Sequence, residues 1–184
     1  MAAARAVPAP LAHLPNALTL LRLALIPIFI AVYVGAGDGS SWAAGWIFLV
    51  AGVTDQVDGF LARRWHVESQ FGRVADPLAD RLMIDAAAIL LALESKLPWA
   101  GAAIIVLRDA LLVGGYKLLM PSGYELNVTM LGKIATWLLY LSVGILTVTG
   151  HATDWPLWLF WFALGLALLA AAQYVVKARR EVAA

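Results

Sequence analysis

Four aspartates occur as two close pairs within a strongly apolar part of the chain. Asp55 and Asp58 are three residues apart and Asp76 and Asp80 are four apart, so each pair shares one face of a helix. The run WAAGWIFLVAGV, just before the first pair, is apolar enough to lie in a lipid bilayer. A carboxylate inside a membrane segment is energetically expensive, and it therefore marks a functional site by default.

The two pairs are expected to face each other across neighbouring helices. The short polar segment RWHVESQ between them predicts a tight connection and an antiparallel helix pair. At 1.5 Å per residue along a helix, the nearer aspartate of each pair lies about 6–7 Å from this connection and the farther one about 12 Å. Asp55 can therefore face Asp80, and Asp58 can face Asp76, at matching depths.

Such a cluster of carboxylates indicates a metal site. Four carboxylates in a low-dielectric site repel one another and cannot all stay ionised without cations. The chain has no Cys, and an all-oxygen donor set favours Mg²⁺ or Mn²⁺ over zinc. Two such ions bridged by shared aspartates are the usual apparatus for phosphoryl-type displacement. A single aspartate would be an ordinary boundary residue, but this spacing predicts two divalent cations.

The elements that must position these aspartates are membrane helices. The chain has 184 residues, of which 62% are hydrophobic and 14% charged, and apolar stretches recur that are long enough to span a bilayer. We predict an all-α integral membrane protein with six transmembrane helices in one bundle and a short N-terminal interfacial helix. The predicted segments are 17–35, 42–63, 73–94, 98–119, 131–149 and 155–176. Residues 1–16 would then be a tail and interfacial segment, and residues 17–180 the membrane domain.

Basic residues set the expected orientation. If the N-terminus is cytoplasmic, Lys96 is the only Lys or Arg in the predicted outer loops. The inner side would hold Arg5, Arg63, Arg64, Arg73, Lys117, Lys133, Lys177, Arg179 and Arg180. This bias predicts a multi-pass protein of the cell membrane, with both termini and the aspartates on the cytoplasmic side. Trp42, Trp99 and Trp155 fall at the predicted outer ends, where their amphipathic rings prefer to sit.

The aspartates belong to a longer pattern of fixed residues. This pattern reads Asp55-x2-Asp58-Gly59-x2-Ala62-Arg63-x8-Gly72-x3-Asp76-x3-Asp80. It resembles the complete signature of the CDP-alcohol phosphotransferases, and the six-helix layout is also that of the family. The resemblance implies that an acceptor hydroxyl attacks the β-phosphorus of a CDP-linked lipid and that CMP is released.

The resemblance also implies residue roles. Asp55, Asp58 and Asp76 would hold one metal ion, and Asp55, Asp76 and Asp80 the second. Asp80 would also be the general base that acts on the acceptor hydroxyl. A glycine in the motif lets a ligand approach the helix backbone closely. The nucleotide-binding residues would be Gly59, Ala62, Arg63 and Gly72.

The run PNALTLLRLALIP resembles the start of bacterial phosphatidylglycerophosphate synthases and the related cardiolipin synthases. By this similarity, residues from several helices would bind the acceptor. These residues are Asn16, Thr19, Arg22, Arg108 and Lys133. Arg108 lies midway along a predicted membrane helix and needs an anionic partner, either Asp109 or an aspartate of the cluster. Its functional interpretation is recognition of an acceptor phosphate.

One position departs from the pattern of the phosphatidylglycerophosphate synthases. They commonly carry GKxKT, whereas this chain has GKIAT, with Ala135 in place of the second lysine. Glycerol 3-phosphate is the expected acceptor and would give phosphatidylglycerophosphate. The alternative acceptor is phosphatidylglycerol, which would give cardiolipin.

The expected partners are CDP-diacylglycerol, a polar or lipid glycerol acceptor and membrane lipids, with no nucleic acid. The family resemblance suggests a homodimer. Two other classes of function are a cation transporter that uses the aspartates as a relay and a non-catalytic membrane subunit. The aspartates gather toward one side, and no ionisable path continues beyond Asp85 and Asp109, which argues against the transporter.

Overall fold

The computed structural model describes the backbone of residues 14–37, 39–65, 70–119, 130–151 and 153–182. It describes the side chains of residues 17–37, 39–54, 81–112, 114, 130–151 and 153–173. Within these ranges the chain forms six α-helices and no strand. The helices are α2 (Leu14–Ala36), α3 (Trp42–Trp65), α4 (Gln70–Leu93), α5 (Trp99–Leu119), α6 (Met130–Val148) and α7 (Trp155–Val182). The prediction of an all-α fold with six long helices is therefore confirmed.

The largest differences from the predicted helix ends are the earlier starts of α2, at Leu14, and of α4, at Gln70, and the later end of α7, at Val182. α2 already begins at Leu14, because Pro15 is tolerated in the first turn of a helix. α7 continues through polar residues to Val182, beyond its apolar stretch. Of the predicted tail and interfacial segment 1–16, residues 1–13 lie outside the described part of the chain, and residues 14–16 form the first turn of α2.

Hydropathy places the bundle in a membrane. Of the described segments, three are long and apolar enough to span a bilayer, namely Ala17–Ala36, Met130–Val148 and Trp155–Gln173. The apolar stretch Trp42–Thr54 of α3 is shorter. α4 and α5 carry charged residues within their length, and among the described ones Asp109 is buried inside the protein.

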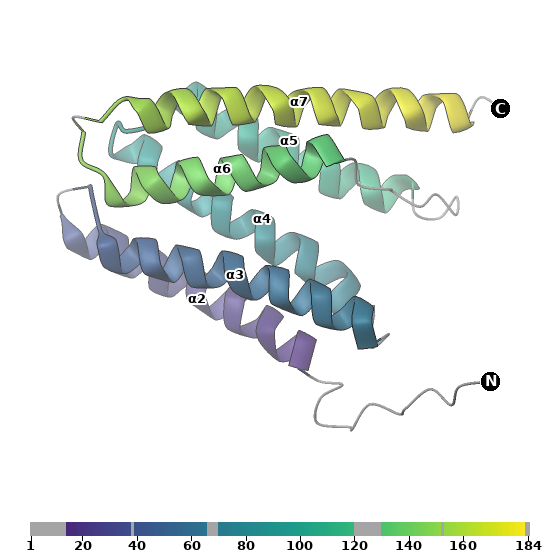
Figure 1. Ribbon diagram of the computed structural model, residues 1–184, viewed down its shortest axis with the longest axis horizontal. Helices are drawn as coiled ribbons and strands as arrows, with labels where there is room; N and C mark the ends of the chain where they lie inside the picture. The colour runs from purple at the N-terminus through teal and green to yellow at the C-terminus, as the bar shows by residue number, and fades with distance from the viewer. Residues whose placement is uncertain (1–13, 38, 66–69, 120–129, 152, 183–184) are drawn as a thin grey trace.

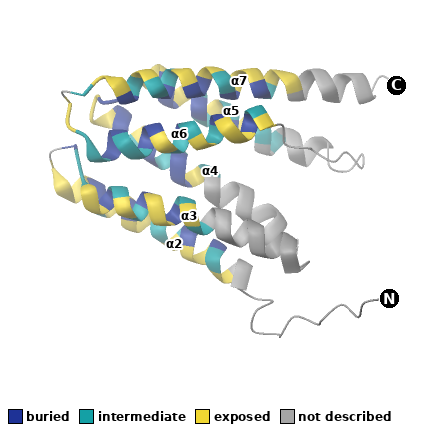
Figure 2. Cartoon of the chain, viewed as in Figure 1, coloured by how far each residue is buried: buried dark blue, intermediate teal, exposed yellow. Residues whose placement is uncertain are grey.

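The bundle core connects helices that are distant in sequence (Figure 1). α2 contacts α3 and α4, and α6 contacts α3, α4 and α7. A row of aromatic rings crosses three of these helices, with ring centroids 5.8 Å apart for Phe29–Phe48 and 5.0 Å apart for Phe48–Tyr140. Figure 2 shows buried and exposed residues alternating along each described helix, and the large apolar side chains among the exposed ones suit contact with lipid.

Glycines bring α3 and α6 close together around an apolar cavity of about 270 Å³. Small residues at helix interfaces let the backbones of membrane helices approach each other. A Cβ added at Gly45 would lie 2.2 Å from Cγ1 of Val148 on α6, so no larger residue fits there without a shift.

We call the connections 37–41, 94–98 and 149–154, with the adjoining helix ends, the Trp end of the bundle. Trp42, Trp99 and Trp155 are the first residues of α3, α5 and α7, and all three are exposed there. They therefore lie together at one end, as the sequence predicts. α2 begins and α7 ends at the opposite end of the bundle (Figure 1).

Within the Trp end, hydrogen bonds join the connections 37–41 and 94–98 to the C-terminus of α6. The backbone N–H of Ser41 donates to the carbonyl of Thr147 at 2.9 Å. Lys96 is only 8% exposed, and its ammonium donates to the carbonyls of Leu146, at 3.0 Å, and Thr149. These carbonyls are the unsatisfied acceptors of a helix C-terminus, where a cation is favourable.

Candidate active site

The predicted metal-binding aspartates lie on two helices that contact each other, α3 and α4. Asp55 and Asp58 belong to the second half of α3, and Asp76 and Asp80 to the first half of α4. Since the two helices are consecutive and run in opposite directions, both pairs belong to the end of the bundle opposite the Trp end, which we call the aspartate end. A donor set made only of carboxylate oxygens fits a hard divalent cation.

Several predicted side chains fall outside the described residues. Among them are the four aspartates and the predicted nucleotide-binding residues Gly59, Ala62, Arg63 and Gly72, together with Asn16. Among the side chains that the structure does describe, no group of three or more acidic or histidine residues could hold a metal ion. The metal-site prediction therefore rests on the positions of the aspartates along α3 and α4.

Two predicted acceptor residues on α2 are completely buried. Thr19 and Arg22 each have a relative exposure of 0%, and they lie one helical turn apart on the same face. Neither is without a partner. A buried arginine in a membrane helix is tolerated only when its charge is directed into the protein. Because α2 contacts α3 and α4, these two side chains lie in the interior that faces the aspartate-bearing helices.

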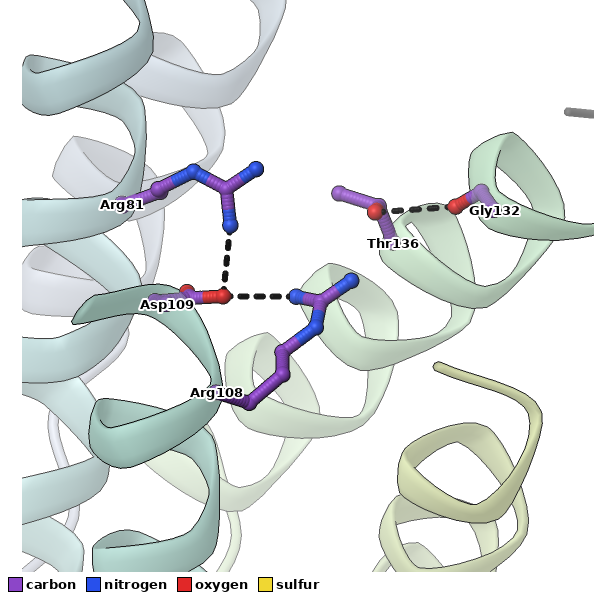
Figure 3. Close-up of polar contacts among 5 residues, drawn as sticks. All are labelled: Arg81, Arg108, Asp109, Gly132 and Thr136. Carbon is purple, nitrogen blue, oxygen red and sulfur yellow. Dashed lines mark hydrogen bonds and ion pairs between the residues drawn. The ribbon is translucent and has the colours of Figure 1, made fainter. Parts of the chain in front are cut away.

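Arg108 has the anionic partner that the sequence requires. Its guanidinium donates to Oδ1 of Asp109 at 2.7 Å, and Arg81 of α4 donates to the same oxygen at 2.6 Å (Figure 3). The Asp109 side chain is 3% exposed, the Arg108 side chain 10% and the Arg81 side chain 27%. Of the two partners that the sequence allows for Arg108, the structure shows Asp109.

The remaining acceptor prediction, Lys133, lies on the surface. It is exposed in the first turn of α6. Ala135, which replaces the second lysine of the related pattern, is completely buried. Nearby, the hydroxyl of Thr136 is used within α6, since it donates to the carbonyl of Gly132 at 3.0 Å (Figure 3). The structure thus buries the side chains of Thr19, Arg22 and Arg108 within the bundle but leaves Lys133 at its edge.

Arg81 is not among the site residues that the sequence predicts. Its position could have indicated a role, because an arginine within a predicted membrane segment requires an anionic partner, and this arginine directly follows Asp80. The choice of Asp109 depends on how α4 and α5 are rotated against each other. Asp85, one turn further along α4, is within electrostatic range of Asp109, Arg81 and Arg108. It therefore faces another helix, as its position opposite Asp76 on the helix suggests.

Comparison with known proteins identifies the family. Residues 12–169 match the family model described as CDP-alcohol phosphatidyltransferase. The chain is 35% identical over 176 residues to a CDP-diacylglycerol–glycerol-3-phosphate 3-phosphatidyltransferase of Bacillus subtilis, covering 89% of this chain and 90% of the relative. It is 32% identical to the protein of the same name from Escherichia coli K12, covering 92% and 96%.

A third relative bears a different name. A cardiolipin synthase (CMP-forming) of Streptomyces coelicolor is 36% identical over 189 residues, covering 93% of this chain and 85% of the relative. The family match covers α2 to α6 in full, including both helices that carry the aspartates, and the first part of α7, residues 155–169. The chain therefore belongs to the CDP-alcohol phosphatidyltransferase family and is an enzyme of phospholipid biosynthesis.

Proposed function

We propose that the protein transfers a phosphatidyl group from CDP-diacylglycerol to glycerol 3-phosphate, giving phosphatidylglycerophosphate and CMP. The observation that carries the proposal is the complete eight-residue signature on two contacting helices, in a chain that matches the family over residues 12–169. The names of the relatives from B. subtilis and E. coli support glycerol 3-phosphate as the acceptor.

The carboxylate of Asp80 acts as the general base. It accepts the proton of the acceptor hydroxyl as the hydroxyl oxygen attacks the β-phosphorus of CDP-diacylglycerol in line with the leaving group. The bond from this phosphorus to the oxygen shared with the α-phosphate breaks, and CMP leaves with that oxygen. The oxygen–phosphorus bond that forms joins the phosphatidyl group to the acceptor.

Asp55, Asp58, Asp76 and Asp80 would hold two divalent cations, Mg²⁺ or Mn²⁺. When bound, these cations neutralise the charge of the phosphates and of the clustered carboxylates. Beside them, a backbone with little side-chain bulk would admit the cytidine nucleotide, and an arginine would stabilise the polar framework. These nucleotide-binding residues are Gly59, Ala62, Arg63 and Gly72.

Residues of other helices would bind the acceptor. Asn16, Thr19 and Arg22 on α2, Arg108 on α5 and Lys133 on α6 are the proposed acceptor residues. Complete burial of Thr19 and Arg22 supports this role, because it directs their polar groups into the bundle rather than toward lipid. Arg108 supports it as well, since a guanidinium recognises a phosphate through paired hydrogen bonds.

A second candidate acceptor is phosphatidylglycerol, which would give cardiolipin. The S. coelicolor relative with that activity in its name favours this candidate, as does the buried Ala135, which leaves its position without a cation. Membership of an enzyme family argues against the cation transporter and the non-catalytic subunit.

Purified protein incubated with CDP-diacylglycerol, Mn²⁺ or Mg²⁺ and one acceptor at a time tests the proposal. Glycerol 3-phosphate is expected to support release of CMP and formation of phosphatidylglycerophosphate, and thorough chelation is expected to stop both. Turnover with phosphatidylglycerol alone would assign the second candidate. Absence of CMP with every acceptor would refute the phosphatidyltransferase assignment, and full activity after chelation would refute the metal site.

The proposed enzyme lies in the cell membrane with both termini and the aspartate end in the cytoplasm. The distribution of basic residues and the position of the tryptophans at the opposite end support this orientation. Residues 17–180 would form the membrane domain, preceded by the tail and interfacial segment 1–16, and two copies would pair as a homodimer. Since the chain has no Cys, single cysteines introduced at the Trp end test the orientation by labelling with a membrane-impermeant maleimide in intact cells.

A further inference from the structure

Asp109 holds two arginines from different helices with one oxygen atom. Its Oδ1 accepts a hydrogen bond from Arg81 of α4 at 2.6 Å and another from Arg108 of α5 at 2.7 Å (Figure 3). The carboxylate is 3% exposed. Removal of one member of such a buried ion pair leaves an uncompensated charge, so the three groups depend on one another.

The first consequence concerns Asp80, which precedes Arg81 in the chain. Successive residues of an α-helix are rotated by about 100° around its axis, so a side chain fixed at one position also sets the direction of the next. The ion pair to α5 fixes Arg81 and therefore limits rotation of α4 at Asp80. A displacement of about 1 Å is enough to reduce catalysis by a positioned group substantially.

The second consequence concerns Arg108 itself. Its Nε is buried and has no hydrogen-bond partner among the described residues, so the bond to Asp109 is what orients its guanidinium there. Asp85 is within electrostatic range but is hydrogen-bonded to neither arginine in the described structure. Asp109 is therefore the group that links α4 to α5 at this level.

We propose that Asp109 is a positioning residue for the transfer reaction. Through Arg81 it fixes the rotation of α4 at Asp80, and through Arg108 it orients the group that receives the acceptor. The inference rests on the proposed function, in which Asp80 is the base and Arg108 an acceptor ligand. In this role neither Asp109 nor Arg81 has to touch the reacting atoms.

A kinetic double-mutant cycle tests this role. Asp109→Asn is expected to lower kcat at least about tenfold and to raise KM for the acceptor, with KM for CDP-diacylglycerol changed by less than about twofold. Arg81→Met is expected to lower kcat to a similar extent. Because the two residues act as one unit, the double variant should be no more than about threefold worse than Asp109→Asn alone. Losses that multiply would overturn the proposal.

Conservative variants separate positioning from general damage. Arg81→Lys retains a cation that can reach Asp109, and it should recover most of the kcat that Arg81→Met loses. Leu111→Ala, at an exposed position of the same helix as Asp109, is the matched control and should behave as the wild type. Equal loss in Arg81→Lys and Arg81→Met would contradict an ion pair that acts by position.

A structural measurement tests the same link without turnover. Since the chain has no Cys, spin labels can be attached through Leu82→Cys on α4 and Leu107→Cys on α5, both at exposed positions. Electron paramagnetic resonance should give a narrow interspin distance distribution in the parent protein and in Arg81→Lys. The distribution should broaden in Arg81→Met.

The outcomes separate this inference from the proposed function. If Asp109→Asn does not fold, Arg81→Met decides, because it leaves the pair of Asp109 with Arg108 intact. Wild-type kcat and an unchanged interspin distribution in Arg81→Met would overturn the positioning role while the phosphatidyltransferase stands. A wild-type protein that releases no CMP overturns the proposed function and, with it, the inference.

Discussion

The bundle contains one buried cation at the Trp end and another about midway along α5, and it holds them in different ways. At the Trp end, the ammonium of Lys96 donates to backbone carbonyls at the C-terminus of α6, which are neutral acceptors. Midway along α5, the guanidinium of Arg108 shares the Asp109 carboxylate with a second arginine, Arg81 of α4. The carbonyls at the end of α6 need a hydrogen-bond donor, and Lys96 supplies it. The Asp109 carboxylate, in contrast, fixes the direction of the Arg108 guanidinium. The contrast suggests that Lys96 contributes to stability and Arg108 to substrate recognition.

The largest effect is expected from substitution of the proposed base, Asp80. Asp80→Asn removes the proposed proton acceptor while keeping the size of the side chain, so CMP release should fall by about 100-fold or more. Asp154→Asn, at an exposed position of the Trp end, is the matched control and should retain full activity. Rates of CMP release and the thermal unfolding of both variants provide the test. Retained activity in Asp80→Asn would remove Asp80 as the base.

The second-largest effect is expected from substitution of Arg108. Arg108→Met removes a buried guanidinium that is proposed to bind the acceptor phosphate, so KM for glycerol 3-phosphate should rise about tenfold or more. Lys133→Met removes an exposed charge that water screens, and its KM should rise less. Initial rates at varied acceptor concentration measure both. The same KM shift in the two variants would contradict the distinction between buried and exposed acceptor residues.

Removal of the Trp-end cation should affect stability instead. Lys96→Met leaves two carbonyls at the end of α6 without their donor, so the free energy of unfolding should fall by about 1–3 kcal/mol. At 25 °C, where the variant remains folded, its kcat should match that of the wild type. Thermal unfolding in detergent micelles and initial rates measure the two effects. A large loss of kcat with normal stability would show that the two ends are not separate in function.

A loss of stability of similar size, with no effect on substrate binding, is expected from a change in the packing of α3 against α6. Gly45→Ala places a Cβ 2.2 Å from Cγ1 of Val148, a β-branched side chain with little rotamer freedom, and overpacking of this kind costs about 1–3 kcal/mol. Gly165→Ala on α7 meets no atom within 4 Å, and its stability should be unchanged or slightly higher. Thermal unfolding of the two variants compares them, and equal stability would contradict the close contact.

Much of the fold can be predicted from the sequence because it depends on local properties. Apolar runs of bilayer length and the glycines and prolines between them are enough to predict six helices, and each corresponds to one helix of the structure. The tryptophans at one end follow from the preference of amphipathic rings for the membrane interface. The helix ends at Leu14 and Val182 depend on backbone hydrogen bonds, which hydropathy does not report.

In the candidate site too, features within one helix can be predicted from the sequence, whereas contacts between helices cannot. The aspartate pairs can be predicted because spacings of three and four residues lie within single helices. The contact of Arg81 with Asp109 joins residues 28 positions apart, and it depends on the rotation of two helices. Apolar residues surround membrane helices on most sides, so their pattern carries little information about that rotation. The same reason explains why the sequence alone does not predict the burial of Lys96.

The contacts of Lys96 and Ser41 with α6 have a consequence for assembly of the protein in the membrane. Both donors belong to connections that leave the ribosome well before residues 146–149, which supply their acceptors. Until α6 has inserted, the connections after α2 and α4 must keep these donors in water. Closure of the Trp end is therefore a late event of biogenesis, and a nascent chain that stops before α6 cannot complete it.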